Sequence, residues 1–198
     1  MSRANSLTAL VGSRICHDLI SPLGAIGNGI ELMGLSGVAE TPEFALIEES
    51  IQAANARIKF FRLAYGAAPT DQSISRAEIT STLAAVARGG RLSYFWKIEG
   101  DQAKGDVRVA FLLFQCFETA MPFGGDITVS AFSGGWEIIA EADRFKIDDR
   151  LWNRLTDTRG RGNISANEVQ FALLQDVMAE RDRKLAIKIN ADKIVVRF

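Results

Sequence analysis

Hydrophobic residues recur at helical intervals over the first third of the chain. The interval holds from about Ser6 to Ala64 and is interrupted once, by Gly34–Thr41. Thr41 suits a helix N-cap, Pro42 a first helical position and Gly66 a helix end. After Thr41, apolar residues alternate three and four apart, which is a heptad seam made of Phe44, Ile47, Ile51, Ala54, Ile58, Phe61 and Tyr65. The pattern therefore predicts an N-terminal helical hairpin.

The first helix carries a matching apolar stripe, which consists of Ile15, Leu19, Leu23, Ile26, Ile30 and Met33. Two helices alone leave much of such stripes in water. A second copy of the chain would bury them in a four-helix bundle around a two-fold axis, so we predict a homodimer. The alternative is that the C-terminal region of the same chain covers the hairpin.

Residues 66–75 concentrate Gly, Pro, Asp and Ser, which is typical of a linker. We therefore divide the chain into a hairpin domain, residues 1–67, and a second domain, residues 74–198. The second domain alternates helical and strand patterns. Helices are predicted at 75–88, 106–121, 148–156 and 165–181, and strands at 91–98, 126–133, 136–142, 185–190 and 193–198. This order predicts an α+β fold, in which helices cover one face of a mixed sheet.

Composition narrows the function classes. The 198 residues carry 23 basic and 24 acidic side chains, a net charge of −1, which argues against a nucleic-acid binder or a polybasic membrane anchor. The short basic cluster 181–184 is typical of a solvated helix end. Cys16 and Cys116 lie far apart in apolar helices and are expected to be buried, reduced thiols. Without a signal-peptide pattern or an apolar run of about 20 residues, we expect a cytoplasmic protein.

His17 is the only histidine. At about 100° per residue it lies roughly 160° from the centre of the apolar stripe, so it is predicted to be exposed rather than part of the core. Its side of the helix carries small and polar residues, with Arg14 and Leu10 at the margins: Ser13, Ser21, Gly24 and Asn28.

The residues after His17 are unusual for a helix. Pro22 removes a backbone donor and predicts a local bend. Gly24, Gly27 and Gly29 each cost about 1 kcal/mol of helix propensity relative to alanine. We expect another backbone to approach closely there.

An exposed imidazole can serve as a general base, a metal ligand or a nucleophile. A metal site needs several ligands and a hydrolase needs a nucleophile elbow, and neither pattern is present in the sequence. A nucleophilic histidine needs only exposure and a neighbour that fixes its tautomer. Asp18 could accept a hydrogen bond from one ring nitrogen, while Arg14, Ser13 and Ser21 could bind phosphoryl oxygens.

The run from His17 to Leu23, HDLISPL, resembles the phospho-acceptor box of sensor histidine kinases. The longer run CHDLISPLGAIGNGIEL resembles more closely the dimeric histidine phosphotransferases of the ChpT type, which relay phosphate in alphaproteobacterial cell-cycle signalling. Ile20 stands where a kinase has Arg or Lys, which is a departure from the kinase pattern only.

The second domain resembles the ATP-binding domain of these kinases in its order of elements, but its motifs differ. Thr119 occupies the position of the magnesium-binding Asn of the kinase, with Gln115 one turn earlier. The stretch Asp143–Ile147 has bulky residues in place of both glycines of Asp-x-Gly-x-Gly. The later glycine-rich box is reduced to Arg159–Asn163. These departures indicate that the domain cannot cradle ATP and Mg²⁺ as a kinase does.

The resemblance implies a histidine phosphotransferase that relays a phosphoryl group between receiver-domain aspartates through His17 without ATP. The donor would be the receiver of a hybrid kinase, and the acceptors response regulators. The chain itself would bind no cofactor or metal, because the Mg²⁺ belongs to the receiver. Asp18 would orient the ring or act as a base. The phosphoryl group or the receiver would contact Ser13, Arg14, Ile20, Ser21, Gly24 and Asn28, with Leu10 in the docking patch.

Two alternatives remain open. The chain could be a non-catalytic dimeric adaptor that docks response regulators, in which case His17 would be dispensable. It could also be an authentic kinase with a degenerate nucleotide site, in which case ATP alone would label His17.

Overall fold

The computed structural model describes residues 3–35, 41–68, 71–156 and 163–198. Its helices are α1 (Arg3–Leu35), α2 (Pro42–Tyr65), α3 (Arg76–Ala87), α4 (Lys104–Ala120), α5 (Asp149–Arg154), the 3₁₀ helix η1 (Ala166–Glu168) and α6 (Val169–Glu180). Its strands are β1 (Ser73–Ile74), β2 (Leu92–Trp96), β3 (Gln102–Ala103), β4 (Gly125–Phe132), β5 (Gly135–Glu141), β6 (Ala186–Ile189) and β7 (Lys193–Arg197). The predicted elements are confirmed, whereas the short pair β1–β3 was not expected and α1 begins three residues early.

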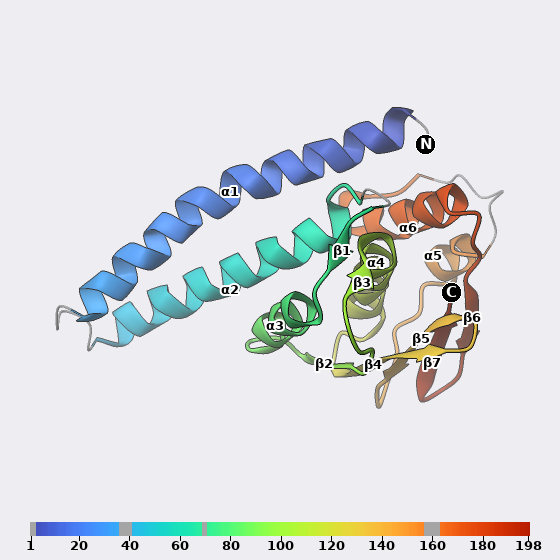
Figure 1. Ribbon diagram of the computed structural model, residues 1–198. Coiled ribbons are helices and arrows are strands. Elements are labelled where there is room, and N and C mark those ends of the chain that lie inside the picture. The colour runs from blue at the N-terminus through green and yellow to red at the C-terminus, as the bar shows by residue number, and fades with distance from the viewer. Residues whose placement is uncertain (1–2, 36–40, 69–70, 157–162) are drawn as a thin grey trace.

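Helices α1 and α2 form the predicted hairpin, which extends well beyond the second domain (Figure 1). The Thr41 hydroxyl caps α2 by accepting a hydrogen bond from the Phe44 N–H at 3.2 Å. Gly66 ends α2 with an extended backbone rather than a left-handed one. A side chain at Gly66 would collide with the Arg62 carbonyl oxygen, so the requirement for glycine comes from this close approach.

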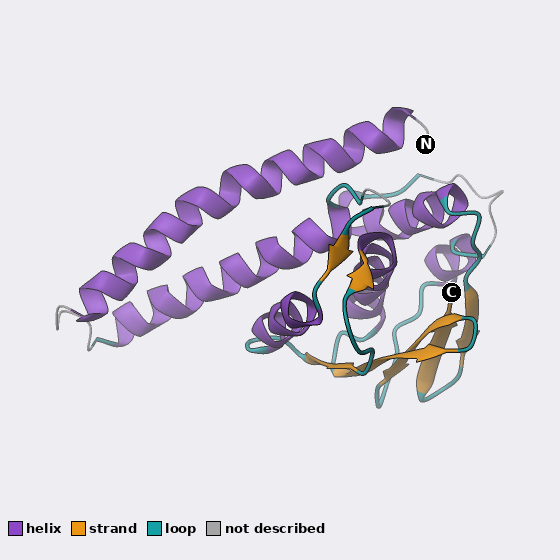
Figure 2. Ribbon diagram, in the orientation of Figure 1, coloured by secondary structure: helices purple, strands orange, loops and turns teal. Residues whose placement is uncertain are grey.

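The five-stranded sheet has the order β2-β4-β5-β7-β6. Strands β2 and β4 are parallel, and every other neighbouring pair is antiparallel. Helices α3, α4 and α6 lie on the side of this sheet that faces the hairpin (Figure 2). The structure thus confirms a mixed sheet with helices on one face.

Helix α4 is the centre of the second domain and is buried on nearly every side. It packs against α6 and α2, and its Phe114 ring lies 5.2 Å from the Tyr94 ring of β2, measured between centroids. The contact with α2 is aromatic: the Phe60 ring lies 4.8 Å from the Phe111 ring and 6.5 Å from the Phe114 ring, measured between centroids. Phe60 is completely buried, so α2 belongs both to the hairpin and to the core of the second domain.

Two sets of ion pairs tie α4 to its neighbours. Arg57 of α2 donates two hydrogen bonds to the Glu118 carboxylate, at 2.7 and 2.5 Å. Arg181 and Arg183, after α6, both bind the Asp106 carboxylate, at 2.5 and 3.0 Å. The interpretation of residues 181–184 as a solvated helix end was therefore wrong for these two arginines. Both arginines are partly buried against Asp106, which lies about 75 residues earlier in the chain, so no local sequence pattern reveals the pairing.

Helix α1 packs on α2 through a face that includes Cys16, Leu23 and Ile30, but most of the predicted stripe remains uncovered. Ile15 is 53% exposed and Ile26 is 49% exposed. The second domain packs on α2 and leaves this stripe of α1 open (Figure 1), so within one chain it covers only part of the hairpin.

The expected close approach at the glycines of α1 occurs at a different position. Space is open within 4 Å of a Cβ built at Gly24 or Gly29, and one built at Gly27 makes ordinary contacts. A Cβ at Gly12, in contrast, would lie 3.0 Å from the carbonyl oxygen of Tyr65. Among the glycines of α1, the close approach therefore occurs at Gly12, five residues before His17 and beside the end of α2.

We predict that Phe60→Ala lowers the free energy of unfolding by about 3–5 kcal/mol, because it leaves a cavity between α2 and α4. Phe123→Ala is the matched control, since Phe123 is 67% exposed, and should cost less than about 1 kcal/mol. Urea unfolding followed by circular dichroism measures both. Equal losses for the two variants would contradict a dominant role for the Phe60 contact.

Candidate functional site

His17 projects from α1 into solvent, with 82% of its side chain exposed, as its helical phase predicts. Its Nδ1 lies 3.1 Å from Oδ1 of Asp18, and Nε of Arg14 lies 2.7 Å from Oδ2 of the same carboxylate. These hydrogen bonds from His17 and Arg14 lower the pKa of Asp18. Asp18 is therefore an ionised acceptor, so Nδ1 must carry the proton that they share. The Nε2 atom is left with the lone pair.

A recess of about 370 Å³ adjoins His17. Helix α1 contributes Ser13, His17, Ile20 and Ser21 to its lining; the end of α2 contributes Arg62 and Gly66, and the start of α4 contributes Lys104. Three elements that are distant in sequence thus meet beside one imidazole. We call this feature the His17 recess.

Local contacts hold α1 against the linker at this level. The Ser13 Oγ accepts a hydrogen bond from the Ala67 N–H at 3.0 Å, just beyond the end of α2. Gly12 allows the preceding close approach to Tyr65. These contacts fix the position of α1, and therefore of His17, along the end of α2.

The structure separates the predicted site residues into two groups. Ser13, Ile20 and Ser21 line the recess together with His17, whereas Arg14 does not line it and contacts Asp18 instead. Gly24 and Asn28 lie further along α1 and do not line the recess. The thiol of Cys16, the preceding residue, is buried, and burial raises its pKa, so it stays protonated and unreactive.

Sequence reasoning missed the two cations of the recess. Arg62 donates to Oε1 of Glu78 at 2.7 Å, and Lys104 donates to the Gln72 amide oxygen at 2.9 Å. Burial first, and the nearby Arg62 second, lower the pKa of Lys104. Arg62 could have been found, because an antiparallel hairpin that turns near residue 38 places position 62 opposite position 15. No local signal in the sequence points to Lys104.

The kinase-like motifs of the second domain are engaged in internal contacts. The Thr119 hydroxyl donates to the Gln115 carbonyl oxygen at 3.1 Å, and the Gln115 amide oxygen accepts from the Tyr65 hydroxyl at 2.9 Å. Phe145 and Ile147, at the positions of the two glycines, pack against the core. Most of the Arg159–Asn163 box lies outside the described residues.

Aromatic side chains fill the space among α4, α5 and α6. The ring centroids of Phe117 and Trp152 are 5.8 Å apart, and those of Trp152 and Phe171 are 5.9 Å apart. All three side chains are buried. This part of the domain is therefore packed core.

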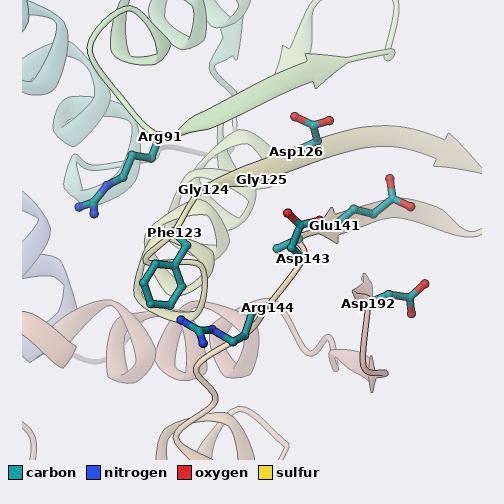
Figure 3. Close-up of a pocket in the computed structure, with 10 residues that line it drawn as sticks. Arg91, Phe123, Gly124, Gly125, Asp126, Glu141, Asp143, Arg144 and Asp192 are labelled. Carbon is teal, nitrogen blue, oxygen red and sulfur yellow. The ribbon is translucent and has the colours of Figure 1, made fainter.

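A larger pocket, of about 810 Å³, opens where β4 starts and β5 ends (Figure 3). Arg144 lies over the Phe123 ring, 4.3 Å from its centroid, and Arg91 lies on the same side of the pocket. The opposite side carries four carboxylates, those of Asp126, Glu141, Asp143 and Asp192. Their charge is unfavourable for nucleotide phosphates.

Within residues 3–35, 41–68, 71–156 and 163–198, no cluster of three or more His, Cys, Asp or Glu side chains could hold a metal ion. Among the helices in these ranges, none is both long enough and apolar enough to cross a membrane.

Comparisons with known proteins agree with this architecture. The family model of the histidine phosphotransferase C-terminal domain matches residues 76–193. The chain is 36% identical to the protein phosphotransferase ChpT of Brucella abortus (strain 2308) over 200 residues, which cover 97% of this chain and 94% of that protein.

Among solved structures, a bacterial phosphotransferase determined at 1.7 Å superposes with a TM-score of 0.69 at 25% identity. The superposition covers 99% of this chain and 96% of that chain, so it includes the hairpin as well as the sheet domain. The family model and the full-length relative show that the chain belongs to the histidine phosphotransferase family.

Proposed function

We propose that this phosphotransferase relays a phosphoryl group between the aspartates of two receiver domains through His17, within a two-component phosphorelay. The observation that carries the proposal is the exposed imidazole whose Nδ1 is held by an ionised carboxylate. That arrangement suits a nucleophile, because one nitrogen is anchored and the other is presented to a partner. The family assignment supports the same chemistry.

In the proposed step, Nε2 of His17 attacks the phosphorus of a receiver's aspartyl phosphate in line with the leaving oxygen. The P–N bond forms as the P–O bond breaks, and the receiver regains its carboxylate. The ring becomes positively charged, with the Nδ1 proton retained and donated to Asp18. The return step to a second receiver is the reverse reaction. Any Mg²⁺ that the transfer needs is bound by the receiver.

The surroundings of His17 suggest roles for the other predicted residues. Asp18 fixes the tautomer and stabilises the ring charge, while Arg14 holds the Asp18 carboxylate through its 2.7 Å contact. Ser13 and Ser21 line the recess, where their hydroxyls can donate to phosphoryl oxygens. Ile20 at the recess and exposed Leu10 on the same helix face offer apolar contact to a receiver.

The phosphoryl group comes from a receiver and not from ATP in this proposal. Buried rings occupy the space among α4, α5 and α6, and Thr119 is engaged with Gln115. The pocket of Figure 3 carries four carboxylates opposite two arginines. These features also disfavour the alternative of an authentic kinase. A cytoplasmic location stays a prediction.

The exposed stripe of α1 supports the proposal of a homodimer. It includes Val11, Ile15, Leu19, Ile26 and Met33, each of which is 45–53% exposed. Such a continuous apolar surface along a helix is costly in water, and a second copy would cover it in a four-helix bundle.

We predict that a radiolabelled, phosphorylated receiver transfers its label to the wild-type chain and that this chain passes it to a second receiver. The label on the chain should be acid-labile and base-stable, as expected of phosphohistidine. His17→Gln should abolish transfer and change stability by less than about 0.5 kcal/mol, because the side chain is exposed. Persistence of signalling by His17→Gln in cells would favour the adaptor, and label from ATP alone would favour a kinase.

We predict that the neutral ring of His17 is mainly the Nδ1–H tautomer. Asp18→Ala should increase the Nε2–H population, because the ionised acceptor at Nδ1 is lost. Glu31→Ala is the control, since it removes an exposed acid from the same helix. ¹⁵N chemical shifts of the ring measure the populations, and an unchanged ratio in Asp18→Ala would exclude the orienting role.

We predict that the wild-type chain sediments as a dimer and that Ile26→Glu makes it a monomer, because a charge would be buried in the bundle. Ala25→Glu places the same charge on an exposed neighbouring position outside the stripe and should remain dimeric. Sedimentation velocity distinguishes the outcomes. A monomeric wild type would contradict the proposed bundle.

A further inference from the structure

Two cationic side chains from other elements line the His17 recess together with residues of α1. Arg62 reaches it from the end of α2, and Lys104 reaches it as the first residue of α4. Both cations therefore come from outside the helix that carries His17. The imidazole of His17 and both cationic side chains line the same recess.

The charges around the recess are unequally compensated. Asp18 contacts Arg14, and Glu78 contacts Arg62 at 2.7 Å. The ammonium of Lys104 instead donates to the neutral amide oxygen of Gln72. Glu78 acts on Lys104 only at longer range, while burial and Arg62 lower the pKa of Lys104. An incoming anion would relieve this strain on the charged form of Lys104.

The backbone around Lys104 is held in place before any partner arrives. Its N–H donates to the Gln72 carbonyl oxygen at 2.9 Å, beside the β1–β3 pair. From Lys104 onward, α4 runs into the core contacts of Phe111 and Phe114 with Phe60. A cation positioned in this way loses little conformational freedom when it binds an anion, which strengthens the net interaction.

We propose that Lys104 is a phosphoryl-binding residue, whose ammonium donates a hydrogen bond to an oxygen of the phosphoryl group on Nε2 of His17. The inference rests on the proposed function and assigns the second domain a direct part in its chemistry. Lys104 forms no covalent bond and keeps its proton. A phosphoryl group carries close to two negative charges at neutral pH, so its contact with an ammonium is charge-assisted. Lys104 thereby stabilises phosphohistidine relative to the receiver's aspartyl phosphate.

The first test uses phosphoramidate, which transfers its phosphoryl group to imidazoles with loss of ammonia and needs no receiver. The titration of Lys104 is followed by its ¹³Cε chemical shift, assigned by comparison with Lys104→Gln. The pKa of Lys104 should rise when His17 is phosphorylated, because the ammonium gains an anionic partner. No rise on phosphorylation, or no label at His17, would overturn the proposal.

The second test measures the equilibrium of phosphate between the chain and a receiver. Lys104→Gln should shift it by about tenfold toward the receiver, which corresponds to the loss of one charge-assisted hydrogen bond. Lys104→Arg keeps the charge, so its equilibrium should stay close to that of the wild-type chain. The matched control is Lys59→Gln, which removes an exposed lysine of α2 that does not line the recess. It should leave the equilibrium unchanged.

The outcomes separate the two proposals. If wild type is labelled by the receiver and Lys104→Gln equilibrates like wild type, the role of Lys104 is wrong and the phosphotransfer function stands. If no receiver labels wild type, the proposed function fails, while the phosphoramidate titration still decides whether Lys104 binds the phosphoryl group. A general loss of folding in Lys104→Gln would be seen in its thermal unfolding, and the phosphoramidate titration of the wild-type chain then decides the question.

Discussion

The contact of Phe60 with Phe111 and Phe114 holds two functional halves of the molecule together. Because α2 is shared between the hairpin and the core of the second domain, the hairpin cannot move independently of α4 without exposing buried rings. The paired hydrogen bonds between Arg57 and Glu118 reinforce the same contact. A histidine kinase must bring its nucleotide domain to its own histidine, whereas a phosphotransferase receives its phosphoryl group from a separate protein. A hairpin that is fixed relative to the second domain is compatible with phosphotransfer from a separate protein.

The second domain is a sheet covered by helices, and aromatic side chains fill its interior. Phe145 and Ile147 add apolar surface where a nucleotide-binding loop would need glycine, and Phe117, Trp152 and Phe171 pack as consecutive rings. Each buried aromatic side chain contributes substantially to the hydrophobic free energy of folding. A core of this kind is stable without a ligand, so the domain can serve as a support for α2 and α4.

Local physics explains how much of this could be predicted from the sequence. The caps at Thr41 and Ser75 depend on neighbouring residues only, so both helix starts were predicted correctly. The exposure of His17 followed from helical phase. In contrast, the pairing of Asp106 with the arginines after α6, and the arrival of Lys104 beside His17, join residues that only the tertiary fold brings together. The glycines after His17 led to a wrong expectation of a close backbone approach, because local composition does not show where another segment of the chain packs.

The position of His17 on α1 has a consequence for stoichiometry. The exposed apolar stripe and the imidazole lie on nearly opposite sides of the same helix. In a bundle closed through that stripe, the two-fold axis would run along the apolar side, and the two imidazoles would point away from each other. Neither recess would then obstruct the other. Such a dimer would have two separate binding sites for receiver domains. A donor receiver and an acceptor receiver could then bind at the same time, on opposite sides of one bundle.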